Sequence, residues 1–69
     1  MADFIRLERI AEFDKASGEA ASTRALLVNP GHIVSITIDD DYQTRIGLAN
    51  GEQHMVTESF DDVERMINP

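Results

Sequence analysis

The side chains that could carry chemistry in this chain are two histidines and a run of three aspartates. His32 and His54 are the only histidines, and a metal site built on them would need carboxylates that converge from elsewhere in the fold. Asp39, Asp40 and Asp41 superficially resemble a calcium loop. An EF-hand loop, however, spaces its ligands alternately, with a central glycine and a later glutamate between two helices. We therefore predict ordinary surface or edge histidines and a solvated aspartate turn.

Serine nucleophiles and glycine-rich loops give no stronger signal. Ser17, Ser22, Ser35 and Ser59 lack a Gly-x-Ser-x-Gly context and have no plausible neighbouring base. The glycines at positions 18, 31, 47 and 51 are too dispersed to form a phosphate-binding loop. We therefore predict that the protein is not an enzyme and has no catalytic, cofactor-binding or metal-binding residues.

Length and charge narrow the remaining possibilities. A chain of 69 residues is long enough for one domain with a shallow core, since domains near this size bury only about 60% of their unfolded surface. The chain has no cysteine, so neither disulfides nor thiolate metal sites can reinforce that core. Thirteen acidic and six basic residues give a formal charge of −7. Because a protein that binds nucleic acid through phosphates needs a basic face, direct nucleic-acid binding is disfavoured.

The N-terminal segment lacks the pattern of a targeting signal. Asp3, Arg6, Glu8 and Arg9 interrupt its apolar residues, so it has no continuous apolar run like that of a signal peptide. No other segment approaches the length of about 20 apolar residues that a membrane span needs. We expect a soluble, cytoplasmic protein that does not bind membranes.

Residues 3–13 allow two interpretations of secondary structure. Phe4, Leu7 and Ile10 would share one face of a helix, whereas Ile5 and Leu7 alternate with polar residues as in a strand. No good N-cap precedes the segment, and the rest of the chain predicts a sheet that could use another strand. We therefore favour the strand.

The next three segments predict a loop, a strand and a turn. Residues 14–22 are small and polar, which favours a flexible loop. The apolar run at the end of residues 23–28 is typical of a buried strand. Pro30 and Gly31 then predict a type II turn over residues 29–32, since proline presets φ and glycine accepts positive φ.

A third strand is expected over residues 33–38. Val34, Ile36 and Ile38 alternate with Ser35 and Thr37, which predicts one buried face and one exposed face.

The strongest local signal is a β-hairpin around Asn50-Gly51. Thr44, Ile46 and Leu48 alternate with other residues as in a strand that leads up to it. Both turn residues tolerate positive φ, so the pair predicts a type I′ turn of two residues. Pairing back from that turn places Ile46 opposite Met55, a sensible core contact.

A short helix is expected to follow the hairpin. Ser59 can accept from the amide of Asp62 as an N-cap, and Arg65 lies near the negative end of the helix dipole. Phe60, Val63 and Ile67 form an apolar stripe that can pack on the sheet. Together these elements predict an α+β, β-rich fold in a single domain over residues 1–69. The architecture is a small curled antiparallel sheet of four to five strands with one C-terminal helix.

Three motifs carry a family resemblance over about 40 of the 69 residues: VN, T-x-I-x-L-x-x-G, and V-x-E-S-x-x-x-V followed by isoleucine. The residues concerned are Val28, Asn29, Thr44, Ile46, Leu48, Gly51, Val56, Glu58, Ser59, Val63 and Ile67. In this region the chain resembles the small FlbD-type flagellar or swarming-motility proteins. The resemblance implies a compact strand-rich domain that ends in a helix, with no catalytic residues. It also implies a tight turn between the first two strands and an accessory or regulatory role exerted through protein contacts.

Two functions from different classes follow from these observations. The first is a non-catalytic protein–protein interaction or regulatory module that binds a protein partner, or a second copy of the chain, through a sheet edge. The alternative is an acidic inhibitor or nucleic-acid mimic that docks on a basic partner, which the charge of −7 and Asp39–Asp41 favour. RNA binding by a small barrel is less favoured because basic and aromatic residues are scarce.

Overall fold

The computed structural model describes residues 4–68 as a five-stranded antiparallel sheet and one C-terminal helix. The elements are β1 (Ile5–Asp14), β2 (Glu19–Val28), the 3₁₀ turn η1 (Pro30–His32), β3 (Ile33–Ile38), β4 (Thr44–Leu48), β5 (Gln53–Val56) and α1 (Phe60–Ile67). The strand order is β2-β1-β5-β4-β3, so β2 and β3 are the two edges of an open sheet. The predicted fold class is confirmed, and so is the strand interpretation of the N-terminal segment from Ile5 onward.

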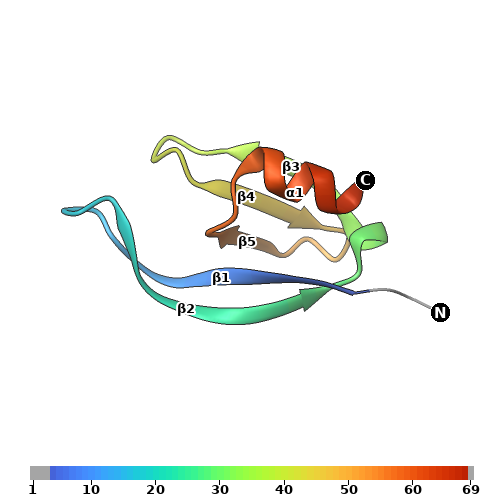
Figure 1. Ribbon diagram of the computed structural model, residues 1–69, viewed down its shortest axis with the longest axis horizontal. Helices are drawn as coiled ribbons and strands as arrows, with labels where there is room; N and C mark the ends of the chain where they lie inside the picture. The colour runs from blue at the N-terminus through green and yellow to red at the C-terminus, as the bar shows by residue number, and fades with distance from the viewer. Residues whose placement is uncertain (1–3, 69) are drawn as a thin grey trace.

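The sheet has two parts of unequal length. In Figure 1, β1 and β2 form a long, arched hairpin along one side, while β3, β4 and β5 are short and lie beside α1. The turn between β1 and β2 extends beyond the other elements, which explains the elongated dimensions of 41 × 23 × 20 Å.

The hydrophobic core lies where these two parts meet. Its fully or nearly fully buried apolar residues are Leu7, Val28, Ile46, Val56 and Val63, one from each of β1, β2, β4, β5 and α1. Partly buried neighbours complete it: Ile5, Leu26, Ile33, Ile36, Leu48 and Ile67. Five small contributions from five elements make a shallow core, as expected for a domain of this size.

The loop predicted over residues 14–22 is much shorter in the structure. Only residues 15–18 form a turn, and Glu19–Ser22 belong to β2. The amide of Gly18 donates to the carbonyl of Asp14 over 2.9 Å, and Gly18 has φ of 74°. Small polar residues therefore extend both strands here because backbone pairing needs no apolar side chain.

The prediction of a type II turn over residues 29–32 is wrong. Pro30–His32 form a 3₁₀ turn, and the φ of Gly31 is not positive. The Asn29 side chain accepts from the amide of Gly31 over 2.9 Å, and the amide of His32 donates to the carbonyl of Asn29. An asparagine that caps its own turn in this way removes the need for a left-handed glycine.

The predicted buried face of β3 is also wrong in part. Ile36 packs on the core as expected, but Val34 and Ile38 are exposed. The register shifts between Ile33 and Ser35, so Val34 is an extra residue relative to β4. Such a bulge changes the side-chain alternation, and it brings Ile33 rather than Val34 onto the core.

The hairpin at Asn50-Gly51 exists, but its turn type and register differ from the prediction. The amide of Gly51 donates to the carbonyl of Leu48, and the amide of Leu48 donates to the carbonyl of Glu52. The loop therefore has three residues, with Gly51 at φ of 91° in the bulge position. Ile46 lies opposite His54 rather than Met55, a shift of one residue.

The start of α1 agrees with the sequence prediction. Ser59 is the N-cap, and its hydroxyl oxygen accepts from the amide of Asp62 over 3.1 Å. The guanidinium of Arg65 forms an ion pair with Asp62 over 3.1 Å. Val63 is fully buried and Ile67 packs on the core, so the apolar stripe faces the sheet.

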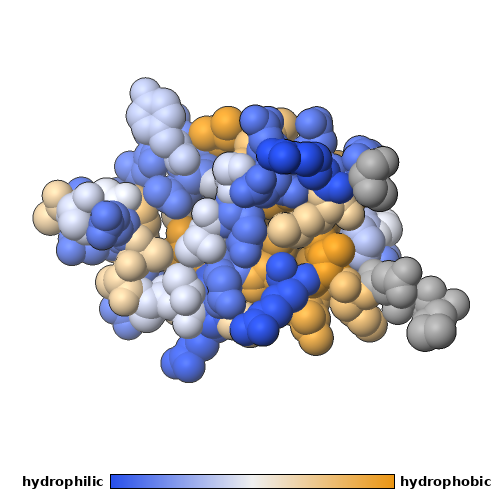
Figure 2. All heavy atoms as spheres, in the orientation of Figure 1, coloured by the Kyte–Doolittle hydropathy of each residue, from blue (hydrophilic) through white to orange (hydrophobic). Residues whose placement is uncertain are grey.

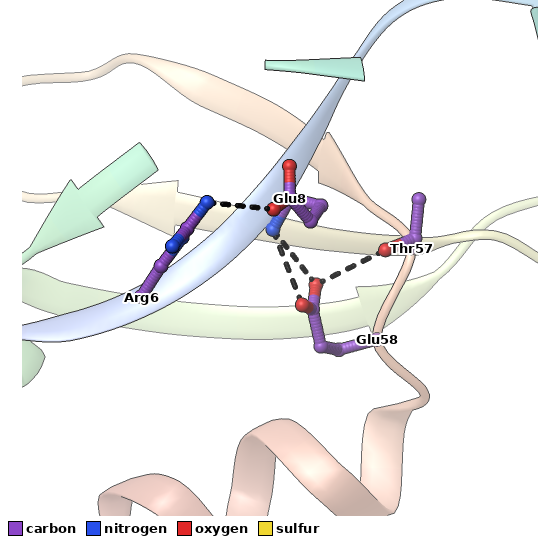
Figure 3. A network of polar contacts seen from close by, with 4 residues as sticks. All are labelled: Arg6, Glu8, Thr57 and Glu58. Carbon is purple, nitrogen blue, oxygen red and sulfur yellow. Dashed lines mark hydrogen bonds and ion pairs between the residues drawn. The ribbon is translucent and has the colours of Figure 1, made fainter. Parts of the chain in front are cut away.

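The two parts of the sheet are joined by a short β1–β5 junction. One residue pair, Arg9 with Val56, is in register, and the amide of Thr57 donates to the carbonyl of Glu8 over 2.9 Å. Beyond that point the carboxylate of Glu58 replaces a neighbouring strand. Both of its oxygens accept from the amide of Glu8 over 3.2 Å (Figure 3). A side chain from the β5–α1 connection thus holds β1 in place.

Candidate functional site

The structure keeps apart the residues that could have formed a metal site. His32 lies in the 3₁₀ turn and His54 in β5, and the two histidines line different pockets. Among residues 4–68, no three or more histidine, cysteine or acidic side chains converge to hold a metal ion.

The three aspartates lie in the β3–β4 turn, as predicted. One carboxylate oxygen of Asp39 accepts from the amides of Asp41 and Gln43, each over 2.9 Å. The amide of Tyr42, whose φ is 61°, donates to the carbonyl of Asp39 over 3.0 Å. Asp39 therefore shapes the turn through one carboxylate oxygen, while its other oxygen pairs with the guanidinium of Arg45 over 3.5 Å.

A largely apolar groove lies beside η1. It has a volume of about 580 Å³ and is lined by Phe4, Leu27, Val28, Asn29, His32, Leu48, Ala49 and Asn50. Phe4 is 60% exposed and Leu27 is 64% exposed. Figure 2 shows hydrophobic side chains gathered on the part of the β1–β2 hairpin nearest η1. We call this feature the apolar groove.

Strand pairing explains how distant residues build the apolar groove. Ile5 pairs with Val28 and Arg6 with Leu27, so Phe4 comes next to the end of β2. The three-residue loop of the β4–β5 hairpin supplies Ala49 and Asn50 from the other side. Because side chains alternate along a strand, Phe4 and Leu27 lie on the same face, away from the core residues Ile5 and Val28.

The outer edge of β2 is unpaired, and its C-terminal end lies at the apolar groove. β2 is an outer strand, and its pairing with β1 is regular from Thr23 to Val28. The other edge, β3, is interrupted by the bulge at Val34, which disfavours the addition of a further strand. The edge of β2 from Thr23 to Val28 is therefore the better template for pairing with another chain.

No motif in the sequence predicts the apolar groove. Phe4 lies in a segment that fits either a helix or a strand, and Leu27 lies in an apolar run that predicts a buried strand. The only available signal was the run of three apolar residues at Leu26–Val28, in which alternation requires the middle side chain to face away from the other two.

Comparisons with known proteins add no relative. The chain matches no family model, no curated protein and no solved structure. No helix within residues 4–68 is long and apolar enough to cross a membrane.

Proposed function

We propose that this protein is a non-catalytic interaction or regulatory module that binds an extended segment of a basic partner protein along β2. The observation that carries this proposal is the position of the apolar groove at the end of the regular β2 edge. An added strand would pair its backbone with Thr23–Val28 and place apolar side chains against Leu27, on the face of the sheet that Leu27 shares with Phe4. This is the β-augmentation mode of peptide recognition, in which backbone bonds give affinity and pockets give specificity.

Charge favours a basic partner over a second copy of the chain. Each copy has a formal charge of −7, so two copies repel each other at long range. Among residues 4–68, His32 is the only titratable side chain that lines the apolar groove, so this part of the groove does not oppose a positively charged segment. Lysine or arginine residues that flank the bound segment would be attracted by the acidic body of the protein.

The family resemblance extends the proposal to flagellar or swarming-motility systems. The β1–β2 connection is a turn of residues 15–18, which agrees with the tight turn that the resemblance implies. Gly51 and Ser59, two positions of the resemblance, act as a bulge glycine and a helix cap in the structure. Both positions support the fold rather than a reaction, in keeping with an accessory role in the cytoplasm.

The alternative, an acidic inhibitor or nucleic-acid mimic, has one supporting observation. The turns at residues 15–18 and 39–43 both lie toward the end of the molecule away from η1 (Figure 1), and acidic residues surround them. Several carboxylates nevertheless have local structural partners: Asp14 and Asp39 bind turn amides, Glu58 binds β1, and Asp62 pairs with Arg65. Carboxylates with such partners are less suited to present a phosphate-like row, so we prefer the interaction module.

The test is partner capture with a matched pair of variants. Immobilised wild-type protein, Leu27→Thr and Val34→Thr are incubated with lysate of the source cells. Leu27→Thr removes an apolar side chain from the groove, while Val34→Thr makes a similar change at an exposed position on the opposite edge. Threonine suits a strand in both cases, so folding should be retained. Circular dichroism checks that it is.

We expect wild type and Val34→Thr to retain one basic protein, and Leu27→Thr to bind it at least about tenfold more weakly, equivalent to about 1.4 kcal/mol. Hydrogen exchange should then show slower exchange of β2 amides in the complex. Equal capture by Leu27→Thr would contradict the proposal. Recovery of a nucleic-acid-binding protein that contacts the acidic turns instead would support the mimic. If the wild-type protein forms a homo-oligomer that dissociates in the Leu27→Thr variant, the edge of β2 serves self-association.

A further inference from the structure

The asparagine of the β4–β5 loop lies in a reactive sequence. The asparagines of the chain are Asn29, Asn50 and Asn68, and the first and the last are each followed by proline. Proline has no amide hydrogen, so its nitrogen cannot close a ring on the preceding side chain. Asn50 is followed by glycine, whose amide nitrogen has no side chain beside it to hinder an attack. Asn50 is therefore the one asparagine of this sequence that can cyclise through the amide that follows it.

The structure leaves room for this ring closure and favours it electronically. Asn50 and Gly51 are both exposed, and a Cβ atom built on Gly51 would meet no atom within 4 Å apart from its neighbours in the chain. The carboxamide oxygen of Asn50 accepts from the amide of Glu52 over 2.9 Å. A hydrogen bond to this oxygen draws electron density from Cγ and stabilises the negative charge that develops on the oxygen when a nitrogen attacks.

One hydrogen bond of the loop opposes the reaction. The amide of Gly51 donates to the carbonyl of Leu48 over 2.9 Å, and this nitrogen must lose its proton before it can attack. The loop therefore has to open, but only over residues 50–52, because the amide of Ala49 is anchored to the carbonyl of His32 over 2.8 Å. Residues 50–52 are all exposed, so their opening breaks no core contact and costs little free energy. The fold should slow the reaction without preventing it.

We propose that Asn50 is a site of spontaneous deamidation in the folded protein. The nitrogen of Gly51 loses its proton and forms a bond to Cγ of Asn50, and the bond from Cγ to Nδ2 breaks as ammonia leaves with that proton. Water then opens the resulting cyclic imide. Attack of water at Cγ gives aspartate, whereas attack at the main-chain carbonyl carbon gives isoaspartate, in which the chain continues through Cγ. Water is consumed and ammonia is released, with no oxidation or reduction.

Either product changes the charge of the apolar groove. Asn50 lines this groove, and a carboxylate replaces its neutral amide, which makes the formal charge one unit more negative than −7. Aspartate keeps an oxygen acceptor for the amide of Glu52 and should preserve the loop, whereas isoaspartate adds a backbone atom to it. The effect on binding rests on the proposed function: the new carboxylate would attract lysine or arginine residues that flank the bound segment.

The experiment follows deamidation by mass spectrometry at neutral pH and physiological temperature. Wild-type protein is incubated in buffer and, in parallel, in urea at a concentration that unfolds it. Peptide mapping locates each modified residue, and chromatography separates the aspartate and isoaspartate peptides. Asn29 and Asn68 are internal controls in the same sample. The variant Asn50→Gln is the matched control for the site, since a glutamine side chain must close a larger ring, and Asn50→Asp provides the product as a standard.

We expect Asn50 to be converted in the folded protein, about tenfold more slowly than in urea, which corresponds to the net loss of one or two hydrogen bonds on opening. Asn29, Asn68 and the glutamine of Asn50→Gln should remain unmodified over the same period. An intact Asn50 in folded protein, after the unfolded chain has been converted, would overturn the proposal. Conversion at Asn29 or Asn68 before Asn50 would also overturn it. Equal rates in buffer and urea would contradict the restraint by the hydrogen bond to Leu48.

The effect on the groove is measured separately by partner capture with Asn50→Asp and Asn50→Gln. We expect Asn50→Asp to bind the basic partner about threefold more tightly than Asn50→Gln at low salt, as one exposed charge pair allows. Circular dichroism checks that both variants are folded. Equal binding would count against the proposed basic segment in the groove. It would leave the deamidation of Asn50 unaffected, because that reaction is measured without a partner.

Discussion

The two hairpins of this protein differ in what holds them together. The β4–β5 hairpin is short, yet it contributes two fully buried side chains, Ile46 and Val56, to the core. The β1–β2 hairpin is about twice as long and contributes Leu7 and Val28, which both lie in the half of the hairpin farthest from its turn. Its other half carries no fully buried residue. The β4–β5 hairpin is therefore stabilised by burial in the core. The half of the β1–β2 hairpin next to its turn is stabilised mainly by backbone hydrogen bonds between its two strands.

The two hairpins should therefore tolerate substitution to different degrees. Removing apolar atoms from a close-packed core costs transfer free energy and leaves a cavity. The outer half of the β1–β2 hairpin has little core to lose, and its register already shifts twice between Ile10 and Phe13. Substitutions at comparable positions in the two hairpins should consequently differ several-fold in their effect on stability.

The largest expected effect is that of Ile46→Ala, compared with Phe13→Ala. Ile46 is fully buried, so its truncation should lower the free energy of unfolding by about 3 kcal/mol. That is most of the stability of a domain this small, about 3–5 kcal/mol. Phe13 lies near the β1–β2 turn and is only partly buried, so Phe13→Ala should lower the free energy of unfolding by about 1 kcal/mol. Urea unfolding followed by circular dichroism measures both values, and equal losses would contradict the contrast between the hairpins.

The next effect should come from Gly51→Val in the β4–β5 loop. Gly51 has φ of 91°, which a β-branched residue resists, so we expect a loss of about 2 kcal/mol. Gly18→Val, at φ of 74° in the β1–β2 turn, is the matched test of the same strain in the other hairpin. An unchanged melting temperature of the Gly51→Val variant would contradict the assignment of a three-residue loop with Gly51 at positive φ.

A smaller effect is expected at the β1–β5 junction, where the two hairpins meet. Glu58→Ala leaves the amide of Glu8 without its carboxylate acceptor and should cost about 1.5 kcal/mol. Glu58→Gln keeps one oxygen acceptor and should recover much of that loss. Thermal unfolding of the two variants distinguishes the hydrogen bond from a general effect of removing charge, because both variants lose the same charge.

The smallest effect concerns the close approach of β3 and β4 at Gly47. A Cβ atom at this position would lie 2.4 Å from the Ser35 hydroxyl oxygen but 3.7 Å from its Cβ. Gly47→Ala should therefore cost about 1 kcal/mol, since the serine must leave its rotamer. The double variant Ser35→Ala/Gly47→Ala should regain wild-type stability. If the double variant is no more stable than Gly47→Ala, backbone strain rather than this contact is responsible.

The sequence predicted the strands, the C-terminal helix and its Ser59 cap because each depends on local periodicity or on one side-chain hydrogen bond. It failed where the outcome depends on one residue of register. The bulge at Val34 and the three-residue loop ending at Gly51 each shift pairing by one position, and a strand pattern of period two has no marker for such shifts.

The candidate sites were harder to predict than the fold for a related reason. The apolar groove brings Phe4 and Leu27 together with Leu48 and Ala49, which are distant in the sequence. These combinations depend on the strand order β2-β1-β5-β4-β3, in which β1 lies next to β5 rather than next to β3.

The β1–β5 junction also governs how the protein opens. A single registered pair, Arg9 with Val56, connects the β1–β2 hairpin to the remaining strands, so we expect the β1–β5 pairing to be the weakest part of the sheet. When β1 separates from β5, Leu7 and Val28 lose their contacts with the core residues Ile46, Val56 and Val63. A second opened copy offers the same surfaces. At high concentration we therefore expect two opened copies to exchange hairpins, which would close both cores in an intertwined dimer.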